Sequence, residues 1–136
     1  VKKLSLEDKV IFEGKKDDIL NEIKDSKLFV LTSDNEGIPN ALAEAMSIGL
    51  PCISTDCTPG GARLLIEDGN NGLLVKKGDS IAISNAIISL IENPALCEKL
   101  GVNAKKIVEK FSEEKIAEKW VIYINKIIEN HKEEQC

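Results

Sequence analysis

Short apolar runs that alternate with helical patterns constrain the fold of this 136-residue chain more than any other feature. Each run is three or four residues long, which suits a strand buried inside a sheet. Strands that alternate with helices form a parallel sheet, because right-handed crossovers place the helices on its faces. We therefore expect an α/β fold, a parallel sheet with flanking helices. The expected strands are residues 10–12, 28–31, 51–54 and 73–75.

Local signals predict where the helices between these strands begin and end. Pro39 suits the first turn of a helix, because its missing N–H would have no partner there. Gly49 suits the end of that helix. Residues 60–66 predict a turn and a short helix, and Asp79 or Ser80 can cap a longer helix after the last strand.

The pattern of the last third of the chain predicts helices. Pro94 ends one helix and begins the next, whose apolar positions continue to Phe111. Ser112 can cap a final helix. Trp120 and Tyr123 share one face of that final helix, and we expect both of them in the core; the alternative is that part of this face is exposed.

Composition excludes several classes of protein. With 43% hydrophobic residues, the chain can bury a core as a single domain. The net charge is −5 and Arg63 is the only arginine, whereas a nucleic-acid binder needs a basic face. No apolar run approaches the roughly 18 residues of a membrane span. One local site can still hold a phosphate against the net charge.

The cysteines are not spaced as a metal site. Cys52 and Cys57 are five positions apart, and the only histidine, His131, lies in a charged tail. No nearby imidazole therefore completes a zinc site, and we expect no metal and no cofactor. We expect Cys52 to be a buried, small apolar residue. Reduced thiols favour a cytoplasmic location.

Both ends of the chain differ from its middle. The sequence opens on Val1, and we expect it to be cut from a longer chain. Residues 130–136 are polar and charged, and we expect them to fray. No linker or internal repeat marks a second domain, so we interpret residues 1–136 as one partial domain.

The segment 32–46 contains more candidate ligand-binding groups than any other loop. It follows an expected strand at the edge of the sheet where α/β proteins bind ligands. Gly37 permits a close backbone approach, and the following helix presents free N–H groups that favour a pyrophosphate. Glu36 and Glu44 can reach one cleft from different depths and accept hydrogen bonds from sugar hydroxyls. Residues 34–35 either contact the same ligand or only shape the turn.

Each of these candidate site residues also has a purely structural interpretation. Glu36 can be a solvated loop carboxylate, and Glu44 can pair with a lysine on an exposed helix face. Residues 60–61 fit a phosphate cradle or a plain turn equally well. For Arg63, a helical ion pair with Glu67 is favoured over a role in steering an anion.

The spacing Glu36-x7-Glu44, within EGIPNALAEAMSIGLPCIST, resembles the E-x7-E motif of retaining family 4 (group 1) glycosyltransferases of the GT-B architecture. The flanks resemble that family in order and spacing: DKVIFEG and DDI precede the motif, and TPGGARLLIEDGNNGLLVKKGD follows it. The resemblance is close over about residues 7–80 and looser over the later helices. Two glutamates alone would be a weak signal, whereas the motif within these flanks is specific.

The resemblance implies a Rossmann-like, C-terminal donor-binding domain that lacks its first strands. It implies retaining transfer of a sugar from a nucleotide-diphosphate sugar, in cell-surface polysaccharide biosynthesis. By this resemblance Glu36 is the catalytic residue at the donor sugar, Glu44 holds the ribose, and Gly14 and Lys15 lie where the nucleobase rests. The implied donor-binding residues are Glu36, Gly37, Ile38, Pro39, Asn40, Ala41, Leu42 and Glu44.

The resemblance also implies what this chain lacks. The family neutralises the leaving diphosphate without a metal, using helix amides with an arginine and a lysine upstream of the matched region. We therefore expect a nucleotide-sugar donor as ligand, a missing N-terminal acceptor domain as partner, and no activity of the chain alone. Docking of the complete enzyme at the inner membrane surface is compatible with this. The alternatives are a nucleotide-sugar epimerase of the same architecture and a non-catalytic nucleotide-binding module.

Overall fold

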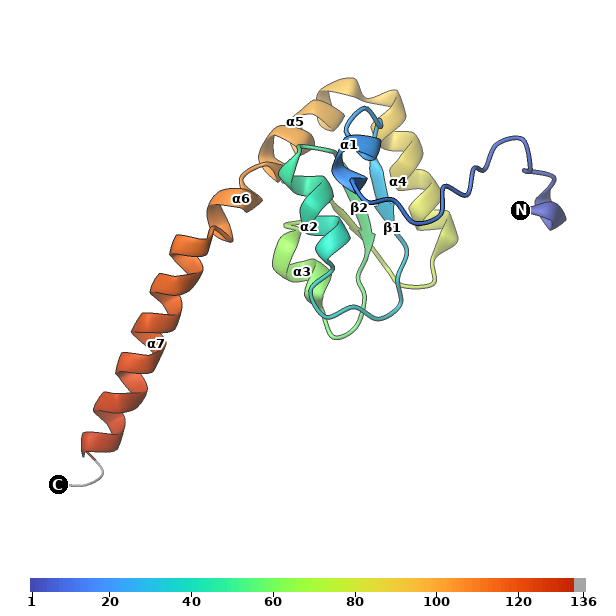
Figure 1. Ribbon diagram of the computed structural model, residues 1–136. Coiled ribbons are helices and arrows are strands. Elements are labelled where there is room, and N and C mark those ends of the chain that lie inside the picture. The colour runs from blue at the N-terminus through green and yellow to red at the C-terminus, as the bar shows by residue number, and fades with distance from the viewer. Residues whose placement is uncertain (134–136) are drawn as a thin grey trace.

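The computed structural model describes residues 1–133 and contains a three-stranded parallel sheet. The order β1-β2-β3 means that the chain returns from each strand to its neighbour through a helix. The register pairs Val30 with Ile53 and Ser54 with Leu74. The expected α/β fold, a parallel sheet with flanking helices, is confirmed (Figure 1). The strands are β1 (Phe29–Leu31), β2 (Cys52–Thr55) and β3 (Leu73–Val75).

Helices cover both faces of the sheet. Along β2, Cys52 and Ile53 are both fully buried but belong to different core clusters, because successive strand residues point to opposite faces. Cys52 packs with Leu42 and Met46 on one face, and Ile53 packs with Leu90 on the other. The helices are η1 (Lys2–Leu4, 3-10), α1 (Ile19–Ile23), α2 (Asn40–Ser47), α3 (Gly61–Leu65), α4 (Ser80–Glu92), α5 (Pro94–Ala104), α6 (Ile107–Lys110) and α7 (Glu113–Glu133).

Capping residues begin and end these helices near the predicted positions. Pro39 stands at the N-cap of α2, one position before the expected first turn. Gly49 follows the end of α2 with φ +84°, a conformation that suits glycine. Side-chain oxygens cap three other helices: Asp18 accepts from the amide of Asn21 (3.1 Å), Asp79 from Ala82 (2.8 Å) and Asn93 from Leu96 (3.0 Å).

Residues 10–12 do not form a strand, so that prediction is wrong. They lie in irregular backbone, where the side chains of Ile11 and Phe12 are 81% and 82% exposed. A strand forms only where a neighbouring strand supplies hydrogen-bond partners, and neither β1, β2 nor β3 pairs with this segment. An apolar run by itself is therefore not sufficient to form a strand.

The helix expected between Pro94 and Phe111 is interrupted. α5 ends at Ala104, and α6 begins at Ile107 after a turn. In that turn the amide of Lys106 donates to the carbonyl of Asn103, only three residues back (3.2 Å), which tightens the backbone. Ala104 and Ile107 are nevertheless both buried, so both helices still face the core.

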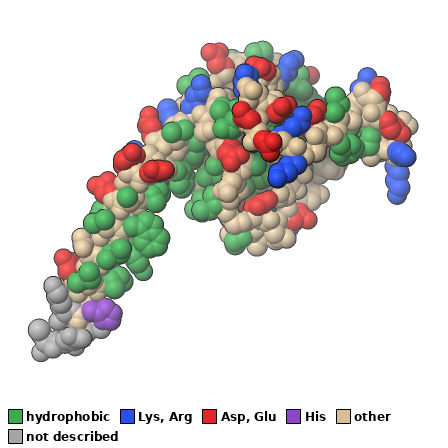
Figure 2. All heavy atoms as spheres, in the orientation of Figure 1, with side chains coloured by type: hydrophobic (Ala, Val, Ile, Leu, Met, Phe, Trp, Pro, Cys, Tyr) green, Lys and Arg blue, Asp and Glu red, His purple; other side chains and the backbone are tan. Residues whose placement is uncertain are grey.

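Helix α7 extends away from the body of the molecule, with apolar side chains uncovered along it (Figures 1 and 2). Ser112 caps it as predicted, since its Oγ accepts from the amide of Lys115 (3.4 Å). Trp120 and Tyr123 are 60% and 57% exposed, so their predicted place in the core is wrong. Their rings contact each other edge to face, with centroids 6.1 Å apart. Periodicity identifies an apolar face but not the surface that the face meets.

Residues 130–133 continue α7, and the expected fraying of residues 130–136 stays a prediction. Residues 134–136 lie outside the described residues. Within residues 1–133 no single helix is both long and apolar enough to cross a membrane. α4 and the segment Pro94–Lys110 reach that length and hydropathy only as a pair, which is bent by 102°.

Candidate functional site

The loops after β1, β2 and β3 meet at one edge of the sheet. The amide of Asp56, just after β2, donates to the carbonyl of Val75 at the end of β3 (2.7 Å). Nζ of Lys77, after β3, lies 3.5 Å from the carbonyl oxygen of Asp34, after β1. Parallel strands end at the same edge, and this is where open α/β sheets bind ligands.

The loop that carries Glu36 is held against the loop after β2 by backbone hydrogen bonds. The amide of Glu36 donates to the carbonyl of Thr58 (2.9 Å), and the amide of Thr58 donates to the carbonyl of Asp34 (3.2 Å). Asn35 and Thr58 thereby form a parallel bridge beyond the end of the strands. The backbone position of Glu36 is therefore set by the sheet rather than by a free loop.

Gly61 lets these two loops approach each other. A Cβ atom built on Gly61 would lie 1.3 Å from the carbonyl oxygen of Gly37, so no other residue fits. Gly60 precedes it with φ +113°. Packing therefore explains Gly61 and the left-handed backbone explains Gly60, so the alternative of a phosphate at these glycines stays a prediction. A Cβ on Gly37 itself would meet nothing within 4 Å, so the outer side of this loop is open.

The side chain of Glu36 is half-buried and has a polar neighbour from its own loop. The hydroxyl of Ser33 donates to Oε1 of Glu36 at 2.8 Å. Ser33 was not among the residues predicted for the site, because no recognised local pattern marks a hydroxyl-to-carboxylate bond within a loop. Glu36 thus has a defined orientation in this loop.

The other predicted donor-binding residues follow Glu36 into α2. Ile38 is exposed and Pro39 is buried. The side chain of Leu42 is fully buried, and its amide donates to the carbonyl of Pro39 (3.1 Å). Asn40 and Ala41 occupy the first turn, where helix amides have no partner within the helix. The amides of these two residues at the N-terminus of α2 are therefore available to a ligand.

Glu44 lies on the exposed face of α2, in a groove of about 340 Å³ between α2 and α6. The groove begins at Ile38 and Asn40, so it is continuous with the loop that follows Glu36. Glu36 precedes the same helix but is not among the residues that line this groove, so a cleft shared by Glu36 and Glu44 stays a prediction. The lining residues are Ile38, Asn40, Ala43, Glu44, Ser47, Leu65, Ile107, Val108 and Phe111.

Gly14 and Lys15, the predicted nucleobase position, lie in the exposed N-terminal segment. Gly14 has φ +69°. Among residues 1–133, no hydrogen bond or ion pair joins either residue to the Glu36 loop or to α2. The neighbouring Lys16 pairs instead with Glu13 (2.9 Å). The structure therefore does not bring this segment to the site, and the nucleobase position stays a prediction.

Arg63 pairs with Asp56, so the predicted pair with Glu67 is wrong. Both guanidinium donors Nε and Nη2 bond the Asp56 carboxylate. That hydrogen bond holds the pKa of Asp56 below its ordinary value of 3.8. Glu67 lies beyond the five-residue helix α3, so the i,i+4 geometry is lost, and its carboxylate accepts from Asn70 (2.9 Å). No local pattern would have shown a pair seven residues apart across a turn.

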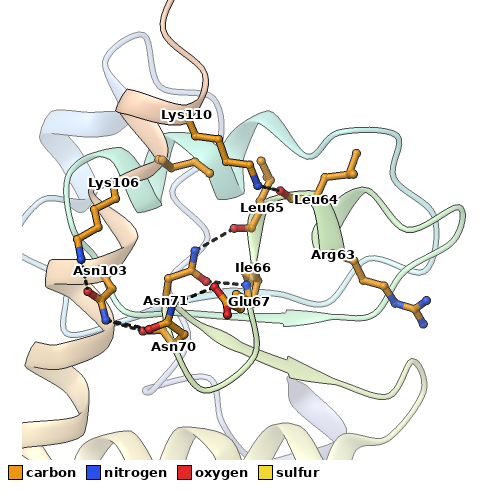
Figure 3. A pocket seen from close by; sticks show the side chains of 11 residues that line it. Arg63, Leu64, Leu65, Ile66, Glu67, Asn70, Asn71, Asn103, Lys106 and Lys110 are labelled. Atoms are coloured by element: carbon orange, nitrogen blue, oxygen red, sulfur yellow. Dashed lines mark hydrogen bonds between the residues drawn. The ribbon is translucent and has the colours of Figure 1, made fainter. Parts of the chain in front are cut away.

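A second cavity, of about 360 Å³, lies between the α3–β3 loop and helices α5 and α6 (Figure 3). Nδ2 of Asn103 donates to the carbonyl of Asn70 (3.0 Å), and Nδ2 of Asn71 donates to the carbonyl of Leu65 (3.1 Å). Lys106 donates to the side-chain oxygen of Asn103 (2.9 Å). These groups bond one another across the cavity, and they tie the loop to the helices.

The thiols and acids form no metal centre within residues 1–133, where no three His, Cys, Asp or Glu side chains gather as ligands. Cys52, Cys57 and Cys97 are free thiols. Burial raises the pKa of Cys52 to about 12, in agreement with its predicted role as a small apolar core residue.

The parallel sheet and the loops after β1, β2 and β3 define an α/β domain of the kind that binds a ligand beyond its strand ends. A family model, glycosyl transferases group 1, matches residues 1–107. The chain therefore belongs to the glycosyl transferases of group 1.

Relatives and solved structures agree with that membership. N-acetyl-alpha-D-glucosaminyl L-malate synthase of Bacillus anthracis is 36% identical over 121 residues, covering 88% of this chain and 31% of the relative. UDP-Gal:alpha-D-GlcNAc-diphosphoundecaprenol alpha-1,3-galactosyltransferase of Escherichia coli is 32% identical over 113 residues, covering 79% of this chain and 29% of the relative. The chain thus spans about a third of the length of these relatives.

The crystal structure of Anabaena HepE in complex with UDP superposes with a TM-score of 0.84 and 28% identity. It covers 92% of this chain and 34% of HepE. HepE has also been solved with UDP-glucose, with a TM-score of 0.82. The likeness therefore extends over nearly the whole chain, and these neighbours contain a nucleotide or a nucleotide sugar.

Proposed function

We propose that this chain is the donor-binding part of a retaining glycosyltransferase that takes its sugar from a nucleotide-diphosphate sugar. The observation that carries the proposal is that one carboxylate directly precedes α2 and a second lies on the exposed face of the same helix. Glu36 is held by the sheet-anchored loop just before the helix, and Glu44 lines the groove along it. Family membership favours this function over the epimerase and the non-catalytic module.

In this proposal Glu36 binds the donor sugar. A carboxylate accepts hydrogen bonds from sugar hydroxyls, and Gly37 beside it leaves open space for a ligand. Glu44 accepts hydrogen bonds from the ribose of the nucleotide. Its groove is otherwise largely apolar, through Leu65, Val108 and Phe111, and such walls strengthen a hydrogen bond to a charged group.

The resemblance places the diphosphate at the amides of Ala41 and Leu42. Because the Leu42 amide donates to the carbonyl of Pro39 (3.1 Å), the diphosphate is proposed to rest on the amides of Asn40 and Ala41 instead. Transfer breaks the bond between the anomeric carbon and the diphosphate oxygen. The acceptor hydroxyl oxygen bonds the same face of the sugar, and its proton passes to the leaving diphosphate. Negative charge then grows on the leaving diphosphate, and preorganised N–H donors stabilise it. Lys77, at the same edge of the sheet, is a nearby cation.

The acceptor is proposed to bind a domain outside this chain, which spans only about a third of its relatives. We therefore propose that residues 1–136 are one partial domain that does not transfer sugar by itself. One relative's name includes a diphosphoundecaprenol acceptor, which is a lipid. By analogy, the complete enzyme is proposed to work in the cytoplasm at the membrane surface, where a lipid-linked acceptor meets a soluble donor.

Calorimetric titration of the chain with UDP and with UDP-glucose tests the donor site. Glu44→Gln is expected to weaken both ligands by about tenfold, because both contain the ribose. Glu36→Gln is expected to weaken UDP-glucose and leave UDP unchanged. Glu92→Gln, an exposed glutamate at the end of α4, is the matched control. Unchanged binding in both site variants would contradict the proposal.

A further inference from the structure

Ser33 forms the one side-chain hydrogen bond described for Glu36 within residues 1–133. Its hydroxyl donates to Oε1 at 2.8 Å, in a partly buried environment. A hydroxyl bond to a carboxylate is charge-assisted and therefore stronger than a neutral one. It engages one of the two carboxylate oxygens and restricts the rotamers of the Glu36 side chain.

Ser33 is itself anchored to the sheet. Its carbonyl accepts a hydrogen bond from Oγ1 of Thr55, the last residue of β2, which is 2% exposed. Three residues on, the Glu36 amide is bonded to the carbonyl of Thr58 (2.9 Å). Donor and acceptor of the Ser33–Glu36 bond are thus both attached to the same strand and its loop. The bond therefore orients Glu36 relative to a rigid part of the molecule.

We propose that Ser33 is a positioning residue that acts through Glu36 and sets the affinity for the sugar part of the donor. This inference rests on the proposed function. A carboxylate that is already oriented loses little conformational freedom when a sugar hydroxyl bonds its remaining oxygen. Ser33 does not touch the nucleotide in this scheme, so its effect is confined to ligands that carry the sugar.

The measured quantity is the ratio of the Kd for a nucleotide sugar to the Kd for UDP, from titration of the full chain. The probes are UDP-glucose, UDP-galactose and UDP-N-acetylglucosamine. The nucleotide sugar with the lowest Kd for the wild-type chain is used for all variants. Ser33→Ala is expected to raise the ratio about five- to tenfold while the Kd for UDP stays constant. Ser33→Thr, which keeps the hydroxyl, is expected to restore the ratio.

The double variant separates positioning from a general structural effect. In a Glu36→Gln background, Ser33→Ala is expected to cause no further change in the ratio, because the two residues act as one unit. Ser89→Ala is the matched control, since Ser89 on α4 is also half-buried and donates to a nearby carbonyl, that of Ala86 (2.8 Å). If Ser33→Ala does not fold, Ser33→Cys, a near-isostere with a weak donor, replaces it.

The outcomes distinguish the two proposals. If Glu36→Gln leaves the ratio unchanged, or if the wild-type chain binds none of the probes, the proposed function fails and this inference fails with it. If Glu36→Gln raises the ratio but Ser33→Ala does not, the donor site stands and only the role of Ser33 is overturned. An equal effect of Ser33→Ala with and without the Glu36 carboxylate overturns that role as well.

Discussion

The carbonyl oxygen of Gly37 occupies the space that any side chain at Gly61 would need. A Cβ atom on Gly61 would lie 1.3 Å from that oxygen. The contact joins the loop after β1, which carries Glu36, to the first residue of α3. Local backbone packing between two strand–helix units thus shapes the edge of the sheet where the donor is proposed to bind.

Gly61→Ala is therefore expected to displace one of these loops. Overpacking of this kind typically costs about 1–3 kcal/mol, and here the obstacle is backbone. Urea unfolding measures the loss, and titration with UDP-glucose reports the effect on the site. For stability, Gly37→Ala is the matched control, because a Cβ there would meet nothing within 4 Å. Equal stability of the two variants would show that the contact is unimportant.

The ion pair between Asp56 and Arg63 predicts a pH dependence of stability. Because the Arg63 guanidinium lowers the pKa of Asp56 below 3.8, the carboxylate stabilises the folded state above that pH. The contribution is lost as the pH falls through the lowered pKa. Asp56→Asn is expected to be less stable than wild type at pH 6, with a difference that shrinks progressively below pH 3.8.

Urea midpoints of both proteins at pH 6 and at pH 3 check this prediction. The pair is exposed, so added salt is expected to reduce the difference at pH 6. Glu67→Gln serves as the control, because Glu67 does not contact Arg63. A larger effect of Glu67→Gln than of Asp56→Asn would contradict the observed pairing.

The thiols are expected to differ in reactivity. Cys52 is fully buried with a pKa of about 12, so almost none of it is thiolate at pH 8. Cys97 is half-exposed. Iodoacetamide at pH 8 is therefore expected to label Cys97 before Cys52, and Cys52 only after unfolding in urea. Peptide mass spectrometry measures the two rates, and rapid labelling of Cys52 in the native chain would show that its burial is transient.

Trp120 is expected to contribute little to the stability of the body. It is 60% exposed on α7, whereas Leu100 of α5 is fully buried against β2 and α4. Trp120→Ala is expected to change the free energy of unfolding by about 0.5 kcal/mol or less, and Leu100→Ala to cost about 2–5 kcal/mol. Chemical denaturation followed by circular dichroism compares them. A comparable loss of unfolding free energy in both variants would show that Trp120 is packed in the core.

Much of the fold could be predicted because its signals are local. The strands at Phe29–Leu31 and Leu73–Val75 are short apolar runs bounded by turn residues. The caps Asp79 and Asn93 act on amides three residues away, so their spacing is visible in the chain. The order of these elements then implies a parallel sheet.

The candidate site was predictable in part for the same reason. Glu36 and Glu44 are joined by one loop and one helix, so their separation along the chain limits their separation in space. The hydroxyl of Ser33 is also close in sequence to Glu36, but no recognised local pattern marks a bond between these two side chains in a loop.

Other features depend on segments that are distant in sequence, and only the tertiary structure decided them. Residues 10–12 have the composition of a strand, but within residues 1–133 they pair with none of the three strands. Arg63 had an acidic residue at helical spacing, yet the early end of α3 turned it toward Asp56.

The chain by itself determined which side chains are apolar, which residues cap helices and which two glutamates flank the start of α2. The tertiary structure decided which strands pair, which apolar faces find a partner and how the Glu36 loop is fixed to β2. The physical reason is that propensity and capping act within a few residues, whereas hydrogen-bond pairing and burial require a second segment at the right distance.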